Sequence, residues 1–221
     1  TSLVLVENTA YGKKLTGPTE LTFRFGDTAT AQILYDQGVV DALWPLSEEQ
    51  MAEMKTADEN WQTEPVLETY SVLFNCDRLE DEQIRKALSL AIDRSALAEL
   101  AGVTAQAAAG LVPPGVPEGE KDFRTTGGNL LDHDGETYED RCREAVELMQ
   151  EAGYDRGSDL STELGAPEYL YVDEGANAAV AAAVCEMWNQ CLGLRVTPRA
   201  VTKTELVTAM RGGEYTLAGM G

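Results

Sequence analysis

The single histidine of the sequence, His133, lies in the acidic segment Asp132-His133-Asp134-Gly135-Glu136. An imidazole among carboxylates could ligate a metal ion, or it could act as the base that activates a serine or cysteine nucleophile. The segment lacks the glycine at the sixth position of a calcium-binding EF-hand loop. The sequence also has no G-x-S-x-G, H-E-x-x-H or P-loop motif. We therefore predict a solvated acidic loop, with no catalytic residue, no metal site and no cofactor.

Four cysteines, Cys76, Cys142, Cys185 and Cys191, could form disulfides or ligate a metal. No two of them have the C-x-x-C spacing of a zinc ribbon or a redox motif. Cys185 and Cys191 are six residues apart near the end of a predicted helix, which places them on different faces. The even number permits disulfides, but we expect buried free thiols.

The charge balance is strongly acidic, because 38 aspartates and glutamates outnumber 17 lysines and arginines and give a formal net charge of −21. Such a field repels phosphate backbones and anionic lipids, so we expect no nucleic-acid partner. The acidic excess either keeps the surface soluble or steers cationic ligands, and both interpretations stay open. Hydrophobic residues make up 43% of the chain, which is enough for one large α/β domain or two small ones.

The elements that must position any functional residue alternate between strands and helices. Apolar and β-branched runs predict strands at residues 3–6, 21–25, 39–44, 70–74, 168–172, 194–201 and 215–218. Helical spacing and capping residues predict helices at 28–36, from 47 onward, and at 81–92, 94–101, 138–152, 176–192 and 204–211. This order favours a layered α/β fold with a mixed sheet. Residues 102–135 are rich in glycine and proline and predict a long functional loop, and no linker divides the chain.

Several motifs occur in the order of one known family. Phe74-Asn75 followed by DEQIRKALSLAIDR at 81–94 is similar to its "FN…DxRVRxALxxAIDR" signature. The other matches are Asn8-xx-Tyr11, YDQGVVD at 35–41, GLVPPGVP at 110–117, EAGYDRG at 151–157, Trp188 with LGLRV at 192–196, and the end of the chain from Gly213. Together they resemble the extracytoplasmic solute-binding proteins of the peptide/nickel ABC transporter family, family 5, of the oligopeptide- and dipeptide-binding type.

The resemblance implies a periplasmic-binding-protein-like fold of type II, with a mixed sheet flanked by helices. Proteins of this family have two lobes that close around a solute. Both ends of the chain look like cuts through a longer protein, so residues 1–221 are expected to be a single C-terminal lobe, with the N-terminal lobe and the extreme C-terminus absent. The implied partners are a peptide or other small solute and the ABC permease subunits in the membrane. The implied location is extracytoplasmic, as a cell-surface lipoprotein or in the periplasm of a bacterium, and a monomer is expected.

The resemblance also implies which positions contact the ligand. Transferring the family's ligand-contacting positions to this sequence gives six candidate ligand-binding residues: Ser71, Leu73, Val172, Asn177, Lys203 and Met210. Some peptide receptors of the family place a histidine and arginines where this chain has Asn177, Met210 and Gly219. The ligand therefore stays open between an oligopeptide, a nickel or other metal chelate, and another small solute.

Two functions outside transport also stay open. A regulator could use the same fold as a sensor domain, although the chain contains no DNA-binding segment. A hydrolase with an unrecognised site would depend on the one histidine, so we predict that the protein is not an enzyme.

Overall fold

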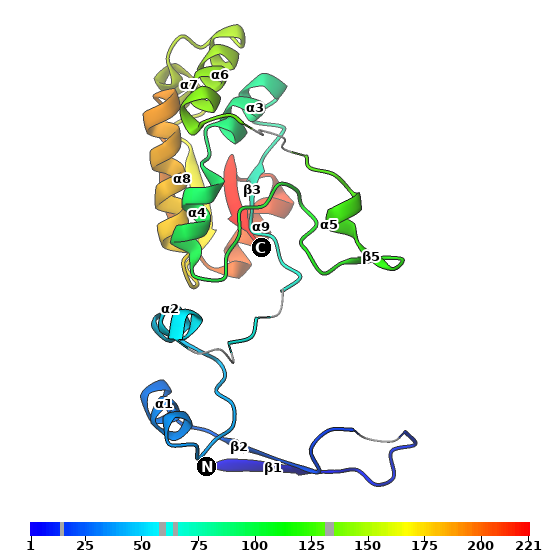
Figure 1. The fold of residues 1–221 in the computed structure, drawn as a ribbon. Coiled ribbons are helices and arrows are strands. Elements are labelled where there is room, and N and C mark those ends of the chain that lie inside the picture. The colour runs from blue at the N-terminus through cyan, green and yellow to red at the C-terminus, as the bar shows by residue number, and fades with distance from the viewer. Residues whose placement is uncertain (14–15, 58–60, 64–65, 131–134) are drawn as a thin grey trace. The chain divides into compact units, whose positions relative to one another are not determined.

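The computed structural model describes residues 1–13, 16–57, 61–63, 66–130 and 135–221 (Figure 1). Within these residues the chain divides into two compact units, Thr1–Trp61 and Gln62–Gly221. The sequence has no linker that marks this division. The single C-terminal lobe expected for residues 1–221 stays a prediction.

The first unit begins with a two-stranded antiparallel hairpin. β1 (Ser2–Val6) pairs with β2 (Glu20–Arg24), so that Leu3 lies opposite Phe23 and Leu5 lies opposite Leu21. Both strands were predicted, β1 from a short apolar run and β2 from its alternating apolar residues. Every residue of the two strands is exposed within the described structure. The hairpin therefore presents apolar side chains that this unit does not cover.

Two capped helices complete the first unit. α1 (Thr28–Asp36) begins after Asp27, whose carboxylate accepts a hydrogen bond from the Thr30 backbone amide at 2.8 Å. α2 (Glu48–Ala57) begins after Ser47. The Ser47 hydroxyl accepts a hydrogen bond from the Gln50 amide, and the Gln50 side chain accepts one from the Ser47 amide. These two hydrogen bonds form a capping box.

The strand predicted at 39–44 is wrong. The backbone amides of Val39 and Val40 both donate to the carbonyl oxygen of Leu34, which belongs to the last turns of α1. These amides complete the end of the helix, and Gly38 supplies the left-handed turn with a φ of 66°. A run of apolar residues forms a strand only where a neighbouring strand pairs with it.

The second unit is built on a four-stranded mixed sheet in the order β3-β8-β6-β7. Its strands are β3 (Ser71–Phe74), β6 (Glu168–Val172), β7 (Thr197–Val201) and β8 (Leu217–Met220). β3 runs antiparallel to β8, whereas β8, β6 and β7 run parallel to one another. The predicted mixed sheet is therefore confirmed, with β7 shorter than predicted and β8 shifted by two residues.

Among the described residues, helices lie on both faces of this sheet, with a larger group on one side than on the other (Figure 1). The first group consists of α3 (Glu82–Leu90), α4 (Arg94–Ala101), α6 (Tyr138–Glu151), α7 (Gly157–Glu163) and α8 (Asn177–Leu192). On the opposite face, α9 (Lys203–Gly212) packs through Leu206 against Leu170 and Ala218. Alternate residues of β3, β6 and β8 thus enter two separate apolar clusters, as strands buried on both faces require.

The larger cluster is centred on Trp188, which has no exposed surface. Its indole Nε1 donates a hydrogen bond to the carbonyl oxygen of Leu88 at 2.8 Å. The ring lies edge-on to Tyr169, with 5.9 Å between the two ring centroids. Ala87 and Ala91 have no exposed surface, so these small residues allow the 81–94 segment to pack closely.

Three features of the second unit differ from the predictions. α7 was not predicted, because its first residues lack a side-chain cap and Gly157 begins it. The segment 102–135 contains a short hairpin of β4 (Pro117–Glu118) and β5 (Lys121–Asp122), followed by α5 (Phe123–Thr126). All four cysteines are free, but only Cys185 is buried, whereas Cys76 is exposed and Cys142 and Cys191 are partly buried.

Among the described residues, every helix is too short or too polar to span a membrane.

Candidate functional site

Three parallel strands of the second unit end at the same edge of the sheet. β6 ends at Val172 beside Val201 of β7, and continuing the register of β6 with β8 brings Met220 to the same level. The antiparallel β3 starts there with Ser71 opposite Met220. In open α/β sheets, ligands bind in the crevice outside the carboxyl ends of the strands. This edge is therefore the first place to look for a binding site.

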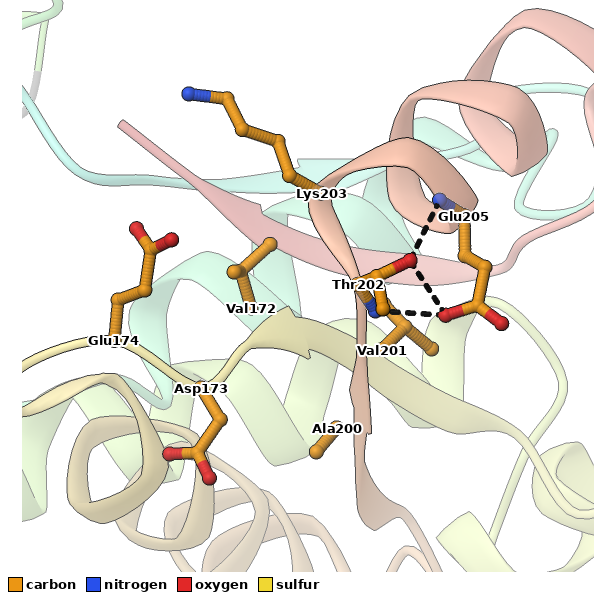
Figure 2. A pocket seen from close by; sticks show the side chains of 8 residues that line it. All are labelled: Val172, Asp173, Glu174, Ala200, Val201, Thr202, Lys203 and Glu205. Carbon is orange, nitrogen blue, oxygen red and sulfur yellow. Dashed lines mark hydrogen bonds between the residues drawn. The ribbon is translucent and has the colours of Figure 1, made fainter.

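An open pocket with a volume of about 480 Å3 lies at this edge. The loop after β6, the end of β7 and the start of α9 form its walls (Figure 2). The residues that line it are Val172, Asp173, Glu174, Ala200, Val201, Thr202, Lys203 and Glu205. Apolar side chains from the strand ends thus form the floor, and charged side chains from the loop after β6 and from the first turn of α9 form the rim.

The start of α9 is fixed by a capping box between Thr202 and Glu205. The Thr202 hydroxyl accepts a hydrogen bond from the Glu205 amide at 3.2 Å, and the Glu205 carboxylate accepts from the Thr202 backbone amide and hydroxyl at 2.8 Å each. These hydrogen bonds lower the pKa of Glu205 below its ordinary value. Lys203 follows the cap directly, so the box sets the position from which its long side chain leaves the helix.

The loop after β6 is held by the carbonyl oxygen of Val172. This oxygen accepts hydrogen bonds from the Glu174 backbone amide at 2.9 Å and from the Asn177 side chain at 3.0 Å. The backbone amide of Asn177 in turn donates to the Glu174 carbonyl oxygen at 3.1 Å. The resulting turn places the exposed carboxylates of Asp173 and Glu174 at the rim of the pocket.

Charges of both signs meet at this rim. In Figure 2 the side chains of Glu174 and Lys203 extend on the same side of the strand ends, and Asp173 points to the other side. No ion pair of Lys203, Glu174 or Asp173 occurs within the part of the chain that the structure describes. Such a rim can donate hydrogen bonds to an anionic group and accept them from a cationic group of one solute. Its arrangement suits non-covalent binding of a polar solute over an apolar floor.

No cluster of three or more His, Cys, Asp or Glu side chains with metal-binding geometry occurs among the described residues. The acidic loop considered in the sequence, Asp132-His133-Asp134, lies outside those residues.

The whole chain, residues 1–221, matches the family described as "Bacterial extracellular solute-binding proteins, family 5 Middle". The chain belongs to family 5. Family 5 consists of binding proteins that act outside the cytoplasm, so this chain is part of a binding protein and not of an enzyme. The predicted family is therefore confirmed.

Relatives of known identity agree with this assignment. The probable deoxycholate-binding periplasmic protein YgiS of Escherichia coli K12 is 27% identical over 194 residues, which are 87% of this chain and 34% of that protein. The unliganded open form of the periplasmic murein tripeptide-binding protein MppA superposes with a TM-score of 0.74 at 23% identity, over 99% of this chain and 41% of MppA. The Haemophilus influenzae OppA complex with the peptide RPPGFSPFR superposes with a TM-score of 0.61 at 23% identity, over 91% of this chain and 39% of OppA.

These structural matches confirm the periplasmic-binding-protein-like fold predicted for the chain. The chain spans about two fifths or less of the length of each relative.

The structure brings two of the six predicted ligand residues into the pocket, Val172 and Lys203. Leu73 and Met210 are partly buried in the cluster between the sheet and α9, where Val172 also packs. Ser71 lies at the start of β3 on the same edge, and Asn177 is engaged with the Val172 carbonyl oxygen. None of these positions tests the assignment of ligand contacts, which stays a prediction.

Six further pocket residues were not among the predicted ones: Asp173, Glu174, Ala200, Val201, Thr202 and Glu205. Asp173 and Glu174 directly follow the predicted strand 168–172, and Thr202 precedes the predicted helix at 204–211. Their place after a parallel strand is the sequence signal that could have identified them.

Gly219, where the family resemblance predicts a larger side chain in some receptors, has no room for a side chain in this structure. A β-carbon at this position would overlap the hydroxyl groups of Tyr70 and Tyr169. Burial raises the pKa of both tyrosines, so both remain neutral phenols. Two neutral hydroxyl groups therefore occupy the space above Gly219.

Proposed function

We propose that this chain contributes one wall of the ligand site of a two-lobe solute-binding protein that delivers oligopeptides to an ABC importer. The observation that carries this proposal is the pocket at the carboxyl ends of β6 and β7, with Val172 on its floor and Glu174 and Lys203 on its rim. A peptide offers amide groups along its backbone and charges at its ends, and such a rim complements both. The candidates Ser71, Leu73 and Met210 would extend this wall along the sheet.

The exposed hairpin of the first unit supports the proposal that the chain is one piece of a larger two-lobe protein. Leu3, Leu5 and Phe23 are each 47% exposed, and Phe25 is 62% exposed. Contiguous apolar surface of this kind is usually covered by another part of the protein. The relatives are also much longer than this chain. We propose that closure of the second lobe over the pocket encloses the solute and signals the permease.

The same proposal includes the setting of the whole protein. It would act as a monomer in the periplasm or as a lipoprotein at the cell surface, where the permease subunits of the importer receive the closed form. The acidic surface, with a formal net charge of −21, would keep the protein soluble there.

A second candidate solute is a small amphipathic acid. YgiS, the curated relative at 27% identity, carries the name of a probable deoxycholate-binding protein. An apolar floor with one lysine at its rim would also hold an apolar body that bears a single carboxylate. In that case Lys203 would make the main polar contact.

The deciding experiment joins this chain to the rest of the two-lobe protein and records melting temperatures with peptides, deoxycholate and nickel chelates. A ligand at a hundred times its dissociation constant stabilises the folded state by about 2.7 kcal/mol. A rise in melting temperature with one class of peptide supports the oligopeptide proposal. A rise with deoxycholate or a chelate alone overturns it and leaves the family assignment unchanged.

A further inference from the structure

Cys142 and Cys191 lie next to each other on two packed helices of the second unit. Cys142 is in the second turn of α6, and Cys191 is in the last turn of α8. The Cys191 thiol donates to the carbonyl oxygen of Cys142, with 3.8 Å between the sulfur and the oxygen. Both side chains are partly buried. This contact brings the Cys191 sulfur beside the backbone that carries Cys142, and a disulfide between the two requires Cα atoms about 4.4–6.8 Å apart.

The geometry points to an oxidisable thiol pair: we propose that Cys142 and Cys191 form a disulfide that joins α6 to α8 when the protein is outside the cytoplasm. Family 5 proteins act outside the cytoplasm, where disulfides form and persist. The bridge would close a loop between residues 49 positions apart, which contains α7 and β6. It would therefore fasten the helical layer behind the strands that carry the pocket.

The other two cysteines offer no competing bridge. Cys185 and Cys191 are on the same helix, and their separation of six residues corresponds to a rise of about 9 Å along its axis, beyond the reach of a disulfide. Cys185 is 2% exposed within the main core. Cys76 is exposed in the turn after β3, and its sulfur contacts only the Phe74 carbonyl oxygen among the recorded hydrogen bonds of the described residues.

Oxidation needs an external disulfide, for which oxidised glutathione or a disulfide-exchange protein would serve. One cysteine thiolate attacks the external disulfide, forms a mixed disulfide and releases one molecule of reduced thiol. The second cysteine then attacks the protein sulfur of the mixed disulfide and releases the second reduced thiol. Two protein thiols lose two hydrogens in total, and one external disulfide is reduced to two thiols. Burial and the neighbouring Cys142 raise the pKa of the Cys191 thiol, so the pair reacts slowly without such an oxidant.

The test equilibrates the chain with oxidised glutathione, denatures it, blocks free thiols with N-ethylmaleimide and maps the unreduced peptides by mass spectrometry. The proposal predicts a linked pair of peptides that contain Cys142 and Cys191, with Cys76 and Cys185 either alkylated or glutathionylated. It also predicts that a reductant lowers the melting temperature of the oxidised chain by roughly 5–15 °C.

Two variants provide the controls. Cys142→Ser/Cys191→Ser should show no linked peptide and no response of the melting temperature to a reductant. Cys76→Ser keeps the proposed pair, and it should respond like the unaltered chain. Should the double variant fail to fold, the peptide map of the Cys76→Ser variant still decides the question. Alkylation of both Cys142 and Cys191 after oxidation, or a linkage through another cysteine, overturns the proposal. None of these outcomes depends on the identity of the transported solute.

Discussion

The hydroxyl groups of Tyr70 and Tyr169 lie 3.4 Å apart, and both contact the space above Gly219. Tyr169 is on β6, Tyr70 directly precedes β3, and Gly219 is on β8, which runs between these two strands. Two tyrosines from the flanking strands thus occupy the volume that a side chain on the middle strand would fill. This contact depends on the absence of a β-carbon at Gly219.

Gly219→Ala should therefore destabilise the second unit. A methyl group would force the buried ring of Tyr169 and the partly buried ring of Tyr70 apart, and overpacking of this kind costs about 1–3 kcal/mol. Urea denaturation followed by circular dichroism measures the loss. Gly212→Ala is the matched control, because a β-carbon there makes only ordinary contacts. Adding Tyr70→Phe to Gly219→Ala should recover part of the loss, since one of the two hydroxyls is removed. Equal stability of Gly219→Ala and the unaltered chain would contradict the packing described.

The indole of Trp188 links the core of the helical layer to the end of α3. Its Nε1 satisfies the carbonyl oxygen of Leu88, which lies in the last turn of α3, where carbonyls lack helical partners. Trp188→Phe removes this hydrogen bond and leaves a cavity, so we expect a loss of about 2–4 kcal/mol in the free energy of unfolding. Trp44→Phe is the control, because Trp44 is 89% exposed. Equal losses of stability in Trp188→Phe and Trp44→Phe would contradict the described role of Trp188.

The capping box of α9 predicts a pH dependence of stability. Hydrogen bonds from the Thr202 amide and hydroxyl lower the pKa of Glu205 below the ordinary value of 4.5. A carboxyl with a lowered folded-state pKa stabilises the folded chain above its unfolded-state pKa, and this contribution disappears as the pH falls through the folded-state pKa. Glu205→Gln should thus be less stable than the unaltered chain at a pH of about 7, and the difference should shrink below about 4.5.

Urea denaturation of both proteins across this pH range measures the difference. Glu99→Gln, which makes the same charge change at an exposed position of α4, serves as the reference. A difference for Glu205→Gln that is constant with pH would exclude the charge of its carboxylate as the cause.

Much of the second unit could be predicted from the sequence, because its local signals agree with its packing. Asp81 caps α3 at the predicted position, and Gly193 ends α8 in the left-handed conformation with a φ of 68°. Ile84 and Leu88 lie on the buried face that their spacing predicts. Capping residues and helical spacing act locally, so a single sequence contains them in full.

Features that depend on distant contacts could not be predicted in this way. α7 begins at Gly157, where a β-carbon would meet the backbone of Leu192 and Leu194, and this close approach to a distant segment leaves no local pattern. The pocket likewise combines the end of β6 with the start of α9, which the sequence order separates. The family resemblance supplied Val172 and Lys203, but the pairing of β6 with β7 was needed to place them together.

The most direct test of the proposed function fills the pocket. Ala200 lines it at the end of β7, and Ala200→Trp in the two-lobe protein would occupy the space where the solute is proposed to bind. Ala182→Trp places the same side chain on the exposed surface of α8 and serves as the control. Isothermal titration with the peptide identified by thermal shift should give at least roughly tenfold weaker binding for Ala200→Trp, or about 1.4 kcal/mol, and unchanged binding for the control. Unchanged peptide affinity in a folded Ala200→Trp variant would contradict the assignment of this pocket as the ligand site.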